Sequence, residues 1–162
     1  MGGKALTYRC NVGEYDSVQQ LGEKIKKDLG KPIDILINNA GVVSGKPIVE
    51  LSEDHITRTL SVNTLAHLWF YKVFLPDMIA NRKGQIVNIV SAAGLTGVSG
   101  LVDYCASKFG AFGAHEALRL ELYSKGLSSD ISMTAVCNLI DFCWLMWIEF
   151  FGFSFFNFDS FR

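Results

Sequence analysis

The sequence predicts an α/β fold built on a doubly wound parallel sheet with helices on both faces. Three apolar runs have the length of a strand: IDILIN at 33–38, GQIVNIVS at 84–91 and ISMTAVC at 131–137. Segments with apolar residues at helical spacing lie between them, and this alternation is typical of a parallel sheet. Strands that are apolar throughout are expected where helices cover both faces.

The composition argues against several classes of protein, including nucleic-acid-binding and metal-binding ones. The 162 residues suit one domain, and a formal net charge of −1 provides no basic excess for binding a nucleic-acid backbone. We therefore expect no nucleic-acid partner. The four cysteines have no CxxC spacing and the three histidines are scattered, which predicts reduced thiols and no metal site. The opening MGGKALTYRC contains no apolar h-region, so no signal peptide is expected.

The first third of the chain is predicted to hold a strand, a helix and a second strand. KALTYRC at 4–10 has strand length and leads into a turn at 11–13. Asp16 or Ser17 is then expected to cap a helix that Gly30 ends. The apolar positions of this helix are Val18, Leu21, Ile25 and Leu29.

Two longer helices are predicted in the rest of the chain. Ser52 precedes two acidic residues and is expected to cap a helix that continues to about Asn81. Pro76 is predicted to kink or break it, because proline cannot donate a helical hydrogen bond. A helix of about twenty residues is expected to start at Val102 and to lead to the third apolar strand.

Residues 138–162 depart from this pattern, so we place a boundary between a domain at 1–137 and an atypical tail at 138–162. The tail holds eight phenylalanines and two tryptophans with little periodicity. It is nearly long enough to cross a bilayer, although Asp141 and Glu149 are costly inside one. A transmembrane helix, an interfacial membrane segment and a non-native tail such as translated intron remain open, and the sequence favours the last.

The segment DYCASK at 103–108 suggests proton-transfer chemistry. Tyr104 and Lys108 are four residues apart, so on a helix they lie on one face. A free phenol has a pKa of about 10, and a nearby ammonium lowers it by stabilising the phenolate. Such a tyrosine exchanges a proton with an alcohol or carbonyl oxygen. An ordinary surface pair is the alternative.

Three further features support the catalytic interpretation. NNAG at 38–41 follows an apolar strand, at the end where open α/β sheets bind ligands. Ser91 ends the next strand and is placed to bond the oxygen that Tyr104 protonates. Asn63 interrupts a helical stretch, which suggests a buried amide with fixed hydrogen bonds. A polar turn, a strand-end serine and a tolerated asparagine are the respective alternatives.

Together these features resemble the short-chain dehydrogenase/reductase family over residues 5–137. Within it the chain is most similar to the retinal dehydrogenase and 17-beta-hydroxysteroid dehydrogenase group, through ILINNAGVVSGK, HLWFYKVFLPDMIANRKGQIVNIVSAAGL and DYCASKFGAFG. The resemblance implies a Rossmann-like fold, NAD or NADP as cofactor, and hydride transfer to or from a lipid alcohol or carbonyl, such as a retinoid or steroid.

The resemblance also implies roles for individual residues. Tyr104 is expected to be the catalytic acid and base, and Lys108 to lower its pKa and hold the nicotinamide ribose. Ser91 is expected to bind and orient the substrate oxygen, and Asn63 to support a water relay to Lys108. The remaining cofactor contacts are expected from Asn11, Val12, Asn39, Ala40 and Gly41. Asn11 stands where the family usually has an aspartate, which weakens that contact.

The sequence departs from the family at both ends. The glycine-rich TGxxxGxG turn is not found, so we expect the first β-α-β unit to be missing, and with it the residue that selects NAD or NADP. An alternative is therefore an inactive isoform that pairs with a full-length homologue through helices at 52–80 and 102–125. By resemblance, the expected location is the cytoplasmic side, at the endoplasmic reticulum membrane or a lipid droplet, with membrane contact through the tail.

Overall fold

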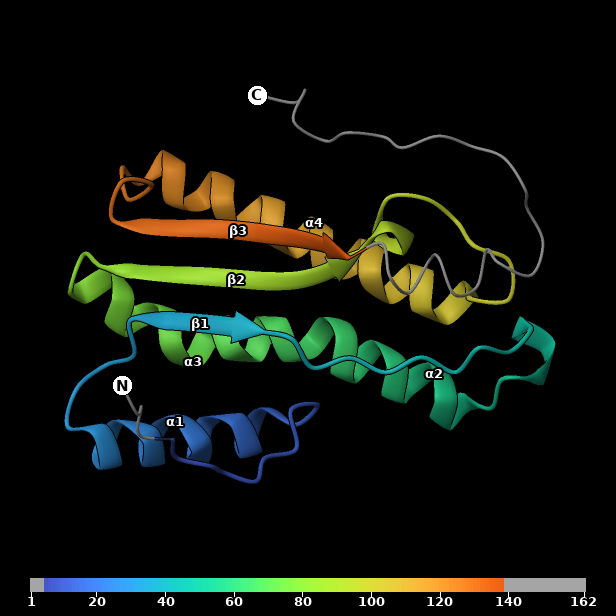
Figure 1. Cartoon of the computed structure of the whole chain (residues 1–162), viewed down its shortest axis with the longest axis horizontal. Coiled ribbons are helices and arrows are strands. Elements are labelled where there is room, and N and C mark those ends of the chain that lie inside the picture. The colour runs from blue at the N-terminus through green and yellow to red at the C-terminus, as the bar shows by residue number, and fades with distance from the viewer. Residues whose placement is uncertain (1–4, 139–162) are drawn as a thin grey trace.

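The computed structural model describes residues 5–138, which form an α/β unit around a three-stranded parallel sheet (Figure 1). The strands are β1 (Ile35–Asn38), β2 (Gly84–Ser91) and β3 (Ile131–Asn138), in the order β1-β2-β3. The register places Ile37 beside Val87, and Val87 beside Thr134. The predicted α/β class and parallel pairing are confirmed, and the predicted tail lies outside the described residues from 139 on.

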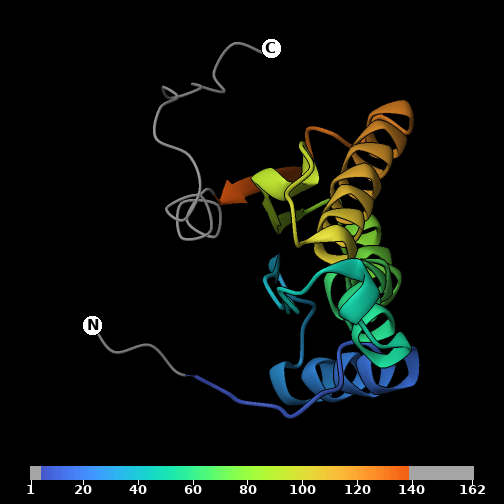
Figure 2. The ribbon, with the colours of Figure 1, turned by 90° about the vertical axis from the view of Figure 1, so that its right-hand side faces the viewer.

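The helices of the described part cover one face of the sheet (Figure 2). They are α1 (Tyr15–Leu29), α2 (Glu53–Leu60), α3 (Ala66–Ala80) and α4 (Val102–Ser124), with short 3₁₀ turns at Ile48–Glu50 and Ala92–Gly94. A single turn of π-helix, η2 (Ser61–Leu65), joins α2 to α3.

The opposite face of the sheet carries no helix among residues 5–138. Burial along β1 alternates accordingly: Leu36 is buried, whereas Ile35 and Ile37 are 53% and 60% exposed. The prediction of helices on both faces is therefore wrong for the described residues. The continuous apolar run does not reveal this difference, because apolar side chains occupy the open face of β1 (Ile35, Ile37) as well as the covered one (Leu36).

The main core lies between the sheet and α3 and α4. Each strand contributes one buried side chain to it from the face that the helices cover, because successive side chains of a strand point to opposite faces. Its buried members are Leu36, Tyr71, Phe74, Met78, Ile86, Leu122, Leu127 and Ile131.

The strand predicted at 4–10 is wrong, because residues 5–10 form no strand. They run beside α1 instead, where the Tyr8 hydroxyl donates to Asp28 at 3.0 Å and the Cys10 sulfur lies 3.3 Å from the Ser17 hydroxyl (Figure 1). A strand requires a hydrogen-bonded neighbour, and the described residues supply none at this position.

The ends of α1 test two predictions. The cap at Asp16 or Ser17 is wrong: the helix begins at Tyr15, and Ser17 accepts a hydrogen bond from the backbone N–H of Asn11 at 2.9 Å. The end at Gly30 is confirmed, since this residue adopts the left-handed conformation with φ 67° and bonds back to the helix.

The helical stretch after Ser52 is interrupted at a different place from the one predicted. Ser52 caps α2 as expected, in a reciprocal capping box with His55. Pro76, however, lies inside α3 without ending it, and the departure from α-helical geometry falls at η2 around Asn63. The predicted helix from Val102 is confirmed, and β3 ends one residue later than expected.

Candidate active site

Tyr104 and Lys108 lie in the first two turns of α4 and are both buried, at 6% and 5% exposure. The Lys108 ammonium nitrogen is 5.6 Å from the centre of the Tyr104 ring. It also donates a hydrogen bond to the backbone carbonyl of Ile89 in β2, at 3.2 Å. The two side chains therefore share one region beside the carboxyl end of the sheet.

The loop that follows β1 lies against this pair. A Cβ atom placed on Gly41 would be 3.7 Å from the Lys108 nitrogen and 3.6 Å from the Asn63 side-chain oxygen. Asn39, Ala40 and Gly41 are themselves exposed. The buried ammonium is thus bordered by solvent-accessible backbone, as a site for a ligand requires.

Asn63 is fully buried within η2, and each of its polar atoms is bonded. Its side-chain oxygen accepts from the Val42 N–H at 2.8 Å, while its amide donates to the Val42 carbonyl at 2.8 Å and to the Ser107 hydroxyl at 2.9 Å. The prediction of a buried amide with fixed hydrogen bonds is confirmed. The π-helical turn here is of a kind that is frequent at functional sites.

Ser91 is the last residue of β2 and is 1% exposed. Its hydroxyl accepts from the Ala93 N–H at 3.2 Å and so caps the short turn that follows. Gly94 ends this turn against α4: a Cβ there would be 2.7 Å from the Lys108 carbonyl oxygen. The sequence analysis missed Gly94, although a glycine three residues after the strand-end serine is a signal of close backbone approach.

Two residues on neighbouring helices were also missed. Thr59 in α2 donates to the carboxylate of Asp103 in α4 at 2.8 Å, and both are buried. The detectable signal was spacing, because Thr59 lies four residues before Asn63 and Asp103 four residues before Ser107.

Two buried histidines lie behind the site. Burial, with the nearby Lys108 and His115 charges, lowers the pKa of His67 to about 4, so its ring is neutral at pH 7. Burial also lowers the pKa of His115, whose ring contacts the Asn88 amide at 2.9 Å. Asn88 in turn accepts from Asn38 at 2.8 Å, so a polar chain links β1, β2 and α4 beneath the site.

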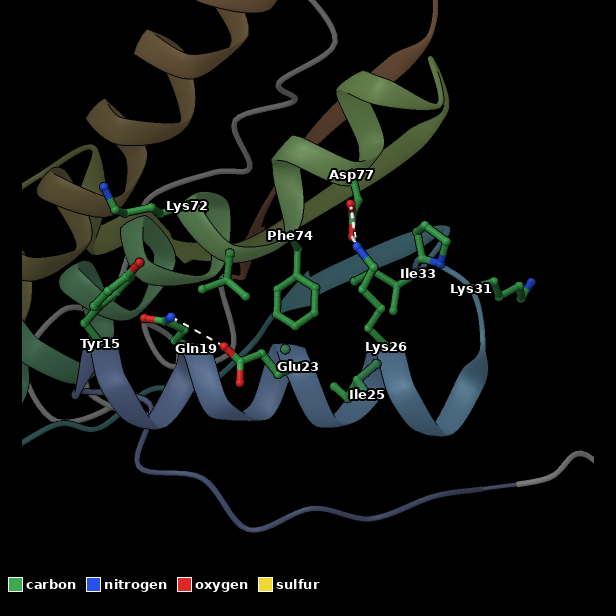
Figure 3. A pocket seen from close by; sticks show the side chains of 13 residues that line it. Tyr15, Gln19, Glu23, Ile25, Lys26, Lys31, Ile33, Lys72, Phe74 and Asp77 are labelled. Carbon is green, nitrogen blue, oxygen red and sulfur yellow. Dashed lines mark hydrogen bonds and ion pairs between the residues drawn. The ribbon is translucent and has the colours of Figure 1, made fainter.

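The structure does not bring every predicted residue to this region. Asn11 is exposed in the loop before α1, where its side chain bonds Glu14 and the Gly13 N–H. Val12 lies beside it in the same loop. The groove of about 290 Å³ between α1 and α3 is lined by Phe74 and by the Lys26–Asp77 ion pair, and by no predicted site residue (Figure 3).

The exposed loop at 39–41 passes close to a buried ammonium, which leaves room for a polar or anionic ligand beside Lys108. No group of three metal-binding side chains occurs among residues 5–138. Over the same range, none of the helices has both the length and the apolar character needed to cross a membrane.

Comparisons with known proteins show what the chain is similar to. Residues 1–139 match the family model described as short chain dehydrogenase. The chain is 47% identical to retinol dehydrogenase 10-B of Danio rerio over 138 residues, which cover 85% of this chain and 40% of the relative. It is 45% identical to epidermal retinol dehydrogenase 2 of Homo sapiens over 130 residues, which cover 80% and 41%.

A solved structure is also similar, that of a metagenomic short-chain oxidoreductase in complex with NADP. It superposes with a TM-score of 0.76 at 29% sequence identity, over 84% of this chain and 60% of the other. The chain spans about two fifths of the length of the two retinol dehydrogenases.

Proposed function

The chain belongs to the short-chain dehydrogenase family, and from this premise we propose that it carries the proton-transfer side of an NAD(P)-dependent oxidoreductase. Its substrate is a lipid alcohol or the corresponding carbonyl. The observation that carries the proposal is the buried Tyr104–Lys108 pair, with the exposed loop at 39–41 beside it. The names of the two retinol dehydrogenases support a retinoid as the substrate class.

In this proposal Tyr104 exchanges the proton of the substrate oxygen. The Lys108 ammonium stabilises the phenolate electrostatically, and its bond to the Ile89 carbonyl holds it in place. Ser91 orients the substrate oxygen from the end of β2. Asn63 fixes the loop after β1 through its two bonds to Val42, and it supports a water relay to Lys108.

The cofactor contacts in this proposal come from Tyr104, Lys108 and the loop Asn39–Ala40–Gly41, with Asn11 and Val12 as predicted contacts at the adenine end. A bound nicotinamide accepts or gives the hydride. The family neighbour in complex with NADP supports a nicotinamide cofactor of either kind. The proposed domain is residues 1–137, with 138–162 as a separate tail.

A direct test measures retinal formation from retinol with NAD or NADP, using the purified chain. Tyr104→Phe should lower the rate by about 10²-fold or more, because it removes the group that accepts the proton of the alcohol. Tyr123→Phe is the matched control on the same helix, since Tyr123 is 70% exposed. Because Tyr104 is also a proposed cofactor contact, the rates are compared at cofactor concentrations that saturate each variant, as judged by NADPH fluorescence. Failure of the parent chain to saturate at millimolar cofactor would contradict the proposal, as would equal rates in the two variants.

A second candidate function is pairing with a full-length homologue. The observation in its favour is a set of exposed apolar side chains on α3 and α4, namely Leu68, Phe109 and Leu120, at 38%, 47% and 56% exposure. Co-expression with epidermal retinol dehydrogenase 2 should then yield a mixed complex that Phe109→Glu weakens. Val49→Glu, at a residue 89% exposed on another element, should leave it intact. Elution of the chain without the homologue would refute this candidate.

Location at the endoplasmic reticulum membrane or a lipid droplet is a proposal that follows from the same resemblance. The contact in question belongs to the tail, which lies outside the described residues. Fractionation of cells that express the chain with and without residues 139–162 tests it: an unchanged membrane fraction would exclude the tail as an anchor.

A further inference from the structure

We propose that the buried Thr59–Asp103 hydrogen bond positions Tyr104, so that Asp103 and Thr59 are positioning residues for proton transfer. The inference rests on the proposed function, because it assigns these residues a task in the same site. Neither residue is among the predicted site residues, although Asp103 is the first residue of the segment DYCASK.

The bond ties the first turn of α4 to α2. Thr59 and Asp103 are 1% and 3% exposed, and their oxygen atoms are 2.8 Å apart. Leu101, the residue before α4, makes no side-chain capping bond to the helix. First turns fray when their N–H groups lack such a partner, so Asp103 provides the side-chain anchor that the cap does not.

The same contact recurs one turn further along both helices. The Asn63 amide donates to the Ser107 hydroxyl at 2.9 Å, and the Thr64 hydroxyl donates to the Ser107 carbonyl at 2.7 Å. Ser107 also donates to the Tyr104 carbonyl at 2.7 Å. Two sets of polar contacts, called rungs below, therefore hold α4 against α2 and η2. One is the Thr59–Asp103 bond, and the other, four residues further on, is formed by Ser107.

The two rungs flank the proposed catalytic pair. Tyr104 directly follows Asp103, and Lys108 directly follows Ser107. Anchoring one neighbour of each catalytic residue fixes the rotation of α4 about its axis, and with it the direction of both side chains. Because Tyr104 is only the third residue of the helix, the Asp103 rung is the one that controls it.

A contribution to the stability of the fold does not by itself explain why a carboxylate, that of Asp103, is buried at this position. Its second oxygen, Oδ1, is buried and has no hydrogen-bond partner among residues 5–138. An incompletely bonded buried carboxylate is unfavourable, and an apolar pair of similar volume is often at least as stable. A role in orientation accounts for the pair, since displacement of a reacting group by about 1 Å lowers rates by as much as about 10²-fold.

The test uses the full chain labelled with [¹³Cζ]-tyrosine, so that the Tyr104 phenol is titrated by NMR and assigned with Tyr104→Phe. Thr59→Val removes the donor of the bond and leaves the Asp103 side chain itself unchanged. Thr59→Ser and Asp103→Asn keep a donor and an acceptor, respectively, and serve as rescue variants. Leu122→Val is the matched control, because it loosens a buried contact at the far end of α4.

Thr59→Val should raise the Tyr104 midpoint by about 0.5 pH unit or more, because the phenol moves away from the Lys108 ammonium. Thr59→Ser, Asp103→Asn and Leu122→Val should not raise it. A wild-type midpoint in Thr59→Val, or an equal rise in Leu122→Val, overturns the proposal. If Thr59→Val does not fold, Thr59→Cys, whose thiol is a weak donor, is compared with Thr59→Ser in the same way.

Steady-state turnover is a second measurement, and it also tests the proposed function. Thr59→Val should lower kcat about tenfold or more with little change in KM, because positioning of Tyr104 affects the transition state more than substrate binding. If the parent chain has no turnover, the proposed function fails, while the NMR titration still decides whether the bond positions Tyr104.

Discussion

Replacing Gly94 by alanine should destabilise the packing of the turn after β2 against α4, next to Lys108. Gly94 ends the turn after β2 and packs directly against the backbone of α4. A Cβ atom at this position would lie 2.7 Å from the Lys108 carbonyl oxygen and 2.9 Å from its carbonyl carbon. Both are main-chain atoms of a long helix, so no rotamer change can relieve the contact.

The size of the effect follows from these distances. Relief to an ordinary contact of about 3.4 Å requires a movement of about 0.7 Å between the turn and α4. Overpacking of this kind costs about 1–3 kcal/mol, partly offset by about 0.4–1 kcal/mol because alanine restricts the unfolded chain. We expect a net loss of about 1–2 kcal/mol and a fall in Tm of about 3–8 °C for a chain of this length.

Gly97→Ala is the matched control, since Gly97 lies in the same loop and a Cβ there would meet nothing within 4 Å. Thermal unfolding followed by circular dichroism should show Gly94→Ala melting below the parent chain and Gly97→Ala at or slightly above it. If Gly94→Ala melts within about 1 °C of Gly97→Ala, the close approach of this turn to Lys108 is refuted.

Three further predictions follow from the same geometry. Asn63→Ala leaves the Val42 N–H and carbonyl without their partner and should lower the free energy of unfolding in urea by about 2–4 kcal/mol; an unchanged midpoint would contradict the bonding described. Because the folded-state pKa of His67 is about 4, below the ordinary 6.5, protons favour the unfolded chain, and stability should fall by up to about 3 kcal/mol between pH 6.5 and 4. His67→Leu should remove that share of the fall, and equal acid sensitivity in both chains would be the contrary result. Gly41→Ala should leave Tm unchanged, because its Cβ would make ordinary contacts at 3.6 and 3.7 Å, yet weaken NADPH binding measured by fluorescence.

The sequence predicts the strands and long helices well where periodicity and end signals agree. The apolar run at 84–91 and the helix from Val102 appear as expected. The predictions are wrong where the structure of a segment depends on an element that packs or pairs with it in space. A strand at residues 5–10 needs a hydrogen-bonding partner, and cover for the open side of β1 needs a second helical layer. Local sequence contains neither piece of information.

Some residues of the candidate site can be predicted from their local sequence, without knowledge of their neighbours in space. Tyr104 and Lys108 share a helical face because of their spacing, and Asn63 is conspicuous because asparagine disfavours helix interiors. Gly94 and the Thr59–Asp103 pair make contacts between elements far apart in the sequence, so their local spacing is a signal but does not identify their partners. Asn11 was predicted from the family resemblance alone; its side chain bonds within its own loop, and its contact with a cofactor stays a prediction.

Several contacts of the site lie on the helical side of the sheet. Among residues 5–138, Asn63 in η2 bonds Ser107 in α4, and Lys108 bonds the Ile89 carbonyl in β2 and lies close to Gly41 after β1. The exposed side chains of Ile35, Ile37 and Val136 point from the opposite side of the same strands. Covering that face buries apolar surface and so acts on the free energy of unfolding, whereas the direction of the Tyr104 phenol is set on the helical side by α2 and α4.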